Sequence, residues 1–158
     1  HRLDLDTSGL MIFANSKFAV SKLNRQFRER SISKTYEALV FGRVDEHAGR
    51  IDLPIGPDPD KRPLRRIDFE RGKDSLTLFE RIEADGGRSR LRLKPITGRS
   101  HQLRIHLMAI GHPILGCDLY AHAAAFSASE RLCLHATGLI LKHPGSEKKV
   151  EFHSQVPF

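Results

Sequence analysis

The chain of 158 residues contains 39% hydrophobic and 28% charged residues, a composition that suits one folded domain and argues against disorder. Its 26 lysines and arginines outnumber its 19 aspartates and glutamates, and the net charge of +7 favours a polyanionic partner over an acidic surface. No apolar run approaches the ~20 residues that cross a bilayer, and no signal-peptide core follows the N-terminus, so we expect no membrane partner and a cytoplasmic location.

Cysteine and histidine spacing gives no sign of a metal site or of a disulfide framework. Cys117 and Cys133 lie far apart in apolar or mixed surroundings, which predicts buried free thiols. His101, His106 and His112 are spaced five and six residues apart, so they cannot share one helical face as metal ligands. We therefore expect neither a metal ion nor another cofactor.

The first nine residues, His1–Gly9, combine a carboxylate, neighbouring cations and small turn residues. Asp4 follows Arg2 closely and precedes the apolar run Leu10–Ala14, for which the sequence predicts a strand. A carboxylate at the mouth of a buried strand is placed where burial and nearby charge tune its pKa. The ordinary alternative for Asp4 is a hydrogen-bonded turn.

A helix and a strand are predicted next. Ser16 is a suitable N-cap for a helix that starts at Lys17, and the helical pattern fades between Ser31 and Lys34. The apolar face of this helix is predicted to comprise Phe18, Ala19, Val20, Leu23 and Phe27. The run Thr35–Phe41 predicts a strand that ends at Gly42 and has Tyr36 near its start.

The middle of the chain predicts a basic loop and a hairpin. Asp52–Arg66 is rich in proline and cations, including Arg65 and Arg66, and should form an exposed basic loop. Leu76–Ala84 and Ser89–Pro95 predict two strands joined across Asp85-Gly86-Gly87. In the second strand, apolar and basic positions alternate, so one face should be apolar and the other positive: Arg90, Leu91, Arg92, Leu93 and Lys94.

The last third begins with a loop that enters a short helix over Thr97–Ile110, stopped by Gly111 and Pro113. Its core positions should be Leu103, Leu107 and Ile110, with His101 and Arg104 on another common face. The remaining predicted elements are a short helix or loop over Ala121–Arg131 and strands at Leu132–Ala136, Leu139–Lys142 and Val150–His153.

Several strands joined by turns, two helices and no glycine-rich phosphate loop predict an α+β fold, either a sheet enzyme or an RNA-binding domain. No repeat, low-complexity tract or linker divides the chain. We therefore expect a single catalytic or binding domain over residues 1–158.

Five motifs in order resemble the RluA family of pseudouridine synthases. The first is His1-Arg2-Leu3-Asp4 with Thr7-Ser8-Gly9. The others are Ser33–Tyr36, Lys94–His106, Gly111–Gly116 and Arg131–Ala136. The resemblance implies a mixed, mainly antiparallel sheet with flanking helices and loops around an RNA-binding cleft. It also implies isomerisation of specific uridines to pseudouridine without a metal or an external cofactor.

The resemblance assigns roles to individual residues. Asp4 is the implied catalytic carboxylate, Arg104 its cationic partner, and Tyr36 the aromatic group that packs against uracil. The reacting atoms of a paired uridine are inaccessible, so the nucleotide must be flipped out, and Arg2 would fill the space it leaves. Further RNA-contact candidates are Arg65, Arg66, Arg90, Arg92, Arg99 and His101. Their ordinary alternatives are structural ion pairs, a core aromatic and solvated charges.

Two departures from the family pattern stand out. The strand and proline-containing loop that precede His1 in the family are absent, so we expect this domain to lack them, and Ser75 replaces an alanine. The expected partner is a structured ribosomal or transfer RNA stem-loop, with no obligate protein partner. The alternatives are a non-catalytic basic RNA-binding or RNA-chaperone protein with the same fold, and a metal-dependent RNA hydrolase.

Overall fold

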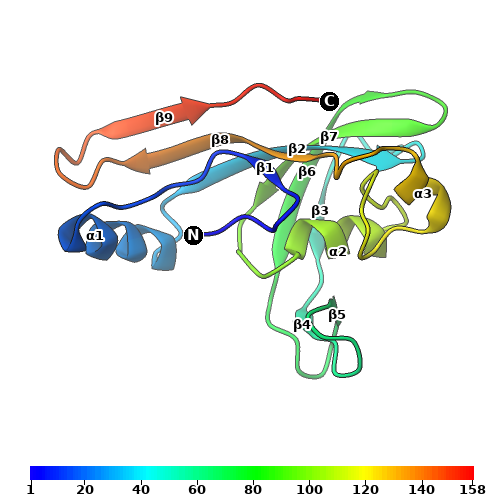
Figure 1. Ribbon diagram of the computed structural model, residues 1–158, viewed down its shortest axis with the longest axis horizontal. Helices are drawn as coiled ribbons and strands as arrows, with labels where there is room; N and C mark the ends of the chain where they lie inside the picture. Colours follow the sequence, from blue (N-terminus) through cyan, green and yellow to red (C-terminus); the bar gives the residue numbers. More distant parts are fainter.

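A computed structural model describes all residues, 1–158, and shows a mixed sheet of seven strands with helices against it (Figure 1). The strand order is β1-β8-β2-β7-β6-β3, and β9 also pairs with β8. Only β1 and β8 run parallel; every other pairing is antiparallel. The predicted α+β fold with a mainly antiparallel sheet is thus confirmed.

The sheet strands are β1 Ser8–Gly9, β2 Ser33–Phe41, β3 Ala48–Asp52, β6 Leu76–Ala84, β7 Arg88–Pro95, β8 Leu134–Lys142 and β9 Lys149–His153. The two-stranded hairpin is β4 Ile55–Pro57 with β5 Arg65–Ile67, and the helices are α1 Lys17–Arg28, α2 Gln102–Ala109 and α3 Ala123–Ser127. No helix has the length and apolar character needed to cross a membrane.

Helices α1 and α2 lie on the same side of the sheet, one towards each end, with the first residues of the chain between them (Figure 1). Leu91 and Leu93 of β7 are fully buried beneath α2, as the alternating pattern of this strand predicts. Leu23 of α1 packs with Leu139 and Leu141 of β8 in a smaller cluster. The two helices therefore cover separate parts of one sheet face and leave room between them.

Helix α1 begins as predicted, because the Ser16 hydroxyl accepts a hydrogen bond from the backbone N–H of Ala19. The predicted apolar face is only partly correct. Leu23 is buried and Phe27 half-buried, whereas Phe18 and Val20 are exposed. Phe18 precedes Leu23 by five positions, so the helical period rotates it away from the sheet.

The strand predicted over Leu10–Ala14 is wrong. Only Ser8 and Gly9 pair with β8, and the last hydrogen bond to β8 comes from the N–H of Leu10. From Gly138 onward, the same edge of β8 is occupied by β9. The apolar run has no free strand edge to join; Leu10 and Ile12 pack against the cluster that contains Leu23 of α1, whereas Met11 and Phe13 are exposed.

Two other predictions need correction. The expected exposed loop over Asp52–Arg66 contains the β4–β5 hairpin, in which Ile55 faces Ile67 and is buried. The prolines of this segment are typical of a loop, so the two strands of the hairpin were not predicted. The two strands predicted over Leu132–Ala136 and Leu139–Lys142 form the single strand β8, because a register shift opposite Thr35 and Tyr36 absorbs the irregularity.

Helix α2 is buried on nearly every side, rather than on the one face predicted. Leu103 and Leu107 join the core as expected, but Ile105 and His106 are also fully buried. The neutral His106 ring is satisfied by the Thr77 hydroxyl and the Leu53 carbonyl. Cys117 and Cys133 are buried free thiols, as predicted.

Candidate active site

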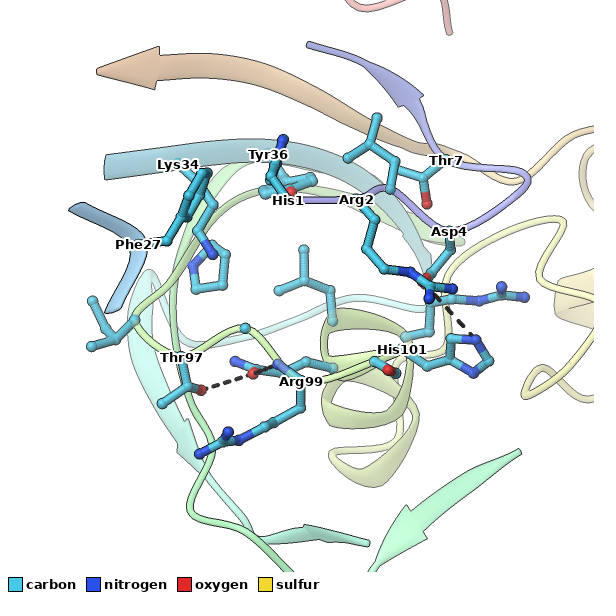
Figure 2. Close-up of a pocket in the computed structure, with 18 of the residues that line it drawn as sticks. His1, Arg2, Asp4, Thr7, Phe27, Lys34, Tyr36, Thr97, Arg99 and His101 are labelled. Carbon is cyan, nitrogen blue, oxygen red and sulfur yellow. Dashed lines mark hydrogen bonds and ion pairs between the residues drawn. The ribbon is translucent and has the colours of Figure 1, made fainter. Parts of the chain in front are cut away.

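A cavity of about 510 Å³ opens between α1 and α2 on the helix-covered face of the sheet (Figure 2). Its wall on one side is the N-terminal segment from His1 to Thr7, and on the other the loop from Pro95 into α2. Residues from the end of α1 and the start of β2 complete it. Three segments that are distant in the sequence, 1–7, 27–36 and 95–104, therefore form one cleft, which we call the active-site cleft.

Asp4 lies in this cleft on a turn that is fastened to the sheet. The N–H of Thr7 donates to the Asp4 carbonyl at 3.0 Å, and Ser8 and Gly9 then pair with β8. Gly9 has a φ of +108°, and a Cβ there would lie 2.3 Å from the carbonyl oxygen of Ala136. Only glycine fits this close approach, so the family-like Thr-Ser-Gly sequence has a steric role in positioning Asp4.

The Asp4 turn is also tied down by side chains. The Ser8 hydroxyl lies 2.8 Å from Nδ1 of His135 and accepts a hydrogen bond from Arg131 at 2.7 Å. Nε2 of His135 in turn contacts the Ser154 hydroxyl at 2.9 Å. These contacts connect the turn to β8 and to the C-terminal segment.

His101 is the ionisable neighbour that the structure gives Asp4, with Nε2 at 4.0 Å from Oδ1 (Figure 2). Both side chains are largely withdrawn from water, with exposed fractions of 18% for Asp4 and 14% for His101. Burial lowers the pKa of His101, partly opposed by the charge of Asp4. The neutral imidazole is thereby favoured.

Arg104, the cationic partner that the resemblance implies for Asp4, lines the cleft, and its ion pair in the structure is with Asp118. Its guanidinium donates to Asp118 at 2.5 Å and to Sγ of Cys117, and it is only 2% exposed. The side chain passes the ring of Tyr120, 5.5 Å from its centroid, to reach these partners. Arg104 thus contributes buried positive charge without touching Asp4.

Tyr36 lies on the sheet face that forms the floor of the cleft, opposite Leu93 of β7 and Ala136 of β8. It is 9% exposed. Burial, and secondarily the charge of Asp4, raises the pKa of its phenol to about 12. Tyr36 is therefore a neutral aromatic surface beside Asp4, which accords with its predicted place against a base.

The loop that enters α2 is held by Gln102. Its Oε1 accepts from the Thr97 hydroxyl at 2.7 Å and from the N–H of Arg99 at 3.0 Å. Its amide group donates to the Leu76 carbonyl and the Thr77 hydroxyl, each at 3.0 Å. Every polar atom of this buried amide is satisfied, so the loop is rigid where it meets the cleft.

Five cations line the cleft and form no ion pair with a carboxylate: Arg2, Arg28, Arg30, Lys34 and Arg99. The guanidinium of Arg99 donates only to the Asp74 carbonyl. Burial lowers the pKa of Lys34, which lies on the floor near Gly98. The cleft is consequently a basic surface whose charges are available to an anion.

The other predicted RNA contacts lie elsewhere. Arg65 and Arg66 are on β5 outside the cleft, and Arg66 pairs with Asp68 at 3.7 Å. Arg90 and Arg92 extend from the opposite face of the sheet, since they alternate with Leu91 and Leu93. Their partners are Glu83 and Glu80, at 2.9 and 3.0 Å. The structure does not bring these four arginines together with Asp4.

Sequence reasoning missed several residues in or beside the cleft. Lys34 belongs to the Ser33–Tyr36 motif but was assigned no role, and Gln102 lies between the two predicted site residues His101 and Arg104. Tyr120 was missed because nothing in its own surroundings points to His101, nineteen positions earlier. No three histidine, cysteine or carboxylate side chains converge as metal ligands.

The cleft, on a mainly antiparallel sheet, presents a carboxylate and a neutral aromatic group among cations that form no ion pair. The chain belongs to the RNA pseudouridylate synthase family, whose model matches residues 1–109. The predicted family and the predicted enzyme class are both confirmed, and RNA is the substrate.

Relatives and solved structures agree with this family. A dual-specificity RNA pseudouridine synthase RluA of Pasteurella multocida is 49% identical, over 100% of this chain and 73% of its own length. The protein of the same name from Escherichia coli is 44% identical over the same shares. The structure of human RNA pseudouridylate synthase domain containing 1 matches the whole chain and 68% of its own, with a TM-score of 0.86 and 34% identity.

Proposed function

We propose that residues 1–158 act as a catalytic domain that isomerises uridine in folded ribosomal or transfer RNA, with Asp4 as the reacting carboxylate. The relatives are named dual-specificity enzymes, and we extend this property to the present chain by proposing that it acts on two classes of RNA stem-loop. The observation that carries the proposal is the position of Asp4 beside Tyr36, in a cleft lined by five cations that form no ion pair.

The isomerisation needs no oxidant, reductant or other external reactant. The bond between N1 of uracil and C1′ of the ribose breaks, the base turns, and a bond from C5 to C1′ forms. N1 gains a proton and C5 loses one, so atoms balance without an oxidant or reductant. Asp4, ionised, serves as nucleophile or base, and Tyr36 provides the flat surface against which the base lies.

The reaction requires the uridine to leave its helix. Arg2 is exposed at the rim of the cleft and pairs with no carboxylate, so its guanidinium is free to stack in the space that the flipped base vacates. The unpaired cations on the other side of the cleft, such as Arg30 and Arg99, supply phosphate contacts. A cytoplasmic location stays a prediction.

The test is release of tritium from RNA that carries uridine tritiated at C5. Asp4→Asn should lower the rate at least about a thousandfold while RNA affinity stays unchanged, because the reacting group is lost but the positive surface is kept. The matched control is Asp6→Asn, an exposed aspartate two residues away that lies outside the cleft and should keep the rate. Full turnover by Asp4→Asn would refute the assignment.

The same assay separates the alternatives. A non-catalytic RNA-binding protein would bind RNA and release no tritium from any cellular RNA. A metal-dependent hydrolase would cleave the RNA, and chelator would stop the cleavage, so intact RNA on a denaturing gel excludes it. Mapping pseudouridines in cells with and without the gene then identifies the uridines that are modified.

A further inference from the structure

Tyr120 does not line the active-site cleft, but its hydroxyl lies 2.6 Å from Nδ1 of the cleft residue His101. The backbone N–H of Arg65, on β5, approaches the same hydroxyl at 3.0 Å. Tyr120 therefore joins the β4–β5 hairpin to the loop that carries His101, and both contacts belong to one oxygen atom.

The direction of these hydrogen bonds follows from the donors and acceptors present. An amide N–H can only donate, so the Tyr120 oxygen accepts from Arg65. The Tyr120 O–H then needs an acceptor, and Nδ1 of His101 is the only one within hydrogen-bonding distance. Nδ1 must keep its lone pair, so the proton of the neutral ring resides on Nε2. That nitrogen is the one 4.0 Å from Oδ1 of Asp4.

We propose that Tyr120 is a positioning residue, which holds His101 as the neutral tautomer with Nε2–H directed at the Asp4 carboxylate. The N–H dipole then orients the carboxylate towards the nucleotide without neutralising it. This inference rests on the proposed reacting role of Asp4, and it adds an interaction between the hairpin, Tyr120 and His101 that keeps the reacting group in place.

The backbone of His101 supports a functional role for this contact. His101 has a φ of +58°, a left-handed conformation that is uncommon outside glycine and persists only when its surroundings enforce it. Tyr120 holds the ring from one side, at a ring-to-ring distance of 5.6 Å and an angle of 70°. Tyr120 is itself held by the guanidinium of Arg104 over its ring.

The charges around His101 come from several elements. Asp4 and Arg2 face it from the N-terminal segment, Arg65 from β5 and Arg104 from α2. Burial is the largest influence and lowers the pKa of His101; Asp4 opposes this shift and the three arginines add to it. Burial also raises the pKa of Tyr120, so its hydroxyl keeps the proton that it donates.

The experiment compares the ring nitrogen signals of His101 in the whole chain with the wild-type residue and with Tyr120→Phe. Nitrogen-15 NMR distinguishes the two tautomers and follows the titration, and a His101→Gln spectrum assigns the signals. His112, whose Nδ1 is bonded to the Phe41 carbonyl outside the cleft, is the internal control. Wild-type His101 should show the Nε2–H tautomer before any substitution is made.

In Tyr120→Phe, the pKa of His101 should rise, because the neutral ring loses the donor that favoured it. Single-turnover tritium release should fall about tenfold, as expected for one lost hydrogen bond, while RNA affinity remains at the wild-type value. The signals of His112 should not move. A rate loss of similar size in His101→Gln would support the same assignment.

Two results would overturn the inference: an Nδ1–H tautomer in the wild-type spectrum, or a raised His101 pKa in Tyr120→Phe with an unchanged rate. A rate loss without any change at His101 would also overturn it, since that pattern belongs to a general structural role. Retained turnover in Asp4→Asn would defeat the proposed function separately, because the ring signals report the Tyr120 contact whether or not Asp4 reacts.

Discussion

Both faces of the sheet carry basic residues, but those on one face are paired with carboxylates and those on the other are not. On the face away from the helices, Arg88, Arg90 and Arg92 of β7 each have a carboxylate partner within 3.2 Å. In the active-site cleft, cations such as Arg2 and Arg30 have none. A strand of alternating arginines is therefore a framework of ion pairs, whereas scattered cations from three segments form the surface for an anion.

The difference shows why the basic stripe of β7 was misleading as an RNA site. Arg90 and Arg92 of this stripe are already paired with carboxylates of the neighbouring strands β2 and β6, which supply Glu37, Glu80 and Glu83. Cross-strand pairs of this kind hold a sheet together and leave little field for a distant polyanion. Position relative to carboxylates, rather than the number of arginines, identifies the binding face.

Arg2→Ala should weaken RNA binding about tenfold and reduce the slope of log affinity against log salt by about 0.7 to 0.9, because the guanidinium that stacks in the vacated space also brings one positive charge among the phosphates. Its thermal midpoint should stay that of the wild-type chain, because Arg2 is exposed and makes no ion pair. The control is Arg92→Ala, which removes an exposed arginine from the opposite face. Equal slopes for the two variants would erase the distinction between the faces.

Arg90→Ala should show the reverse pattern, a loss of about 1 to 1.5 kcal/mol in the free energy of unfolding with unchanged RNA affinity. Arg90 is 20% exposed, contacts two glutamates, donates to the Phe158 carbonyl and lies over the Phe158 ring. Urea unfolding and a salt titration of RNA binding measure the two quantities. A binding defect with intact stability would return Arg90 to the RNA surface.

Much of the fold was accessible from the sequence because several patterns were local. The Asp85-Gly86-Gly87 turn predicted the β6–β7 hairpin, and Ser16 predicted the start of α1. The strand expected over Leu10–Ala14 failed because the outcome depends on β9, which competes for the same edge of β8 from the other end of the chain. Local propensity contains no information about such competition.

In the candidate site, too, some features could be predicted from local sequence and others depend on distant contacts. The motifs predicted Asp4, Tyr36 and His101, and the structure brings these three into one cleft. The pairing of Arg104 could not be read from its motif, since Asp118 and Cys117 reach it only after α2 has folded against the following loop. The face on which Arg90 and Arg92 lie also required the strand register, because a shift of one residue would reverse it.

Lys34→Met tests whether a cleft cation is kept for binding at the expense of stability. Burial lowers the pKa of Lys34, so its charged form is disfavoured in the folded chain and stability increases with pH up to the unfolded value of 10.5. At pH 7, the variant should gain about 1 kcal/mol in free energy of unfolding and bind RNA roughly three- to fivefold more weakly. A lower stability in Lys34→Met would contradict this, because it would show that the Lys34 ammonium is already stabilised by its surroundings in the RNA-free protein.

His106 should make the core beneath the cleft sensitive to acid. Burial lowers its pKa below 6.5 in the folded chain, so below pH 6.5 the unfolded chain binds more protons and stability falls as the pH falls. The decrease should stay under about 1 kcal/mol per pH unit, and His106→Gln should flatten it in urea unfolding between pH 7 and about pH 5.5. An unaltered slope in His106→Gln would move the acid sensitivity to His101 and His135, whose pKa values burial also lowers.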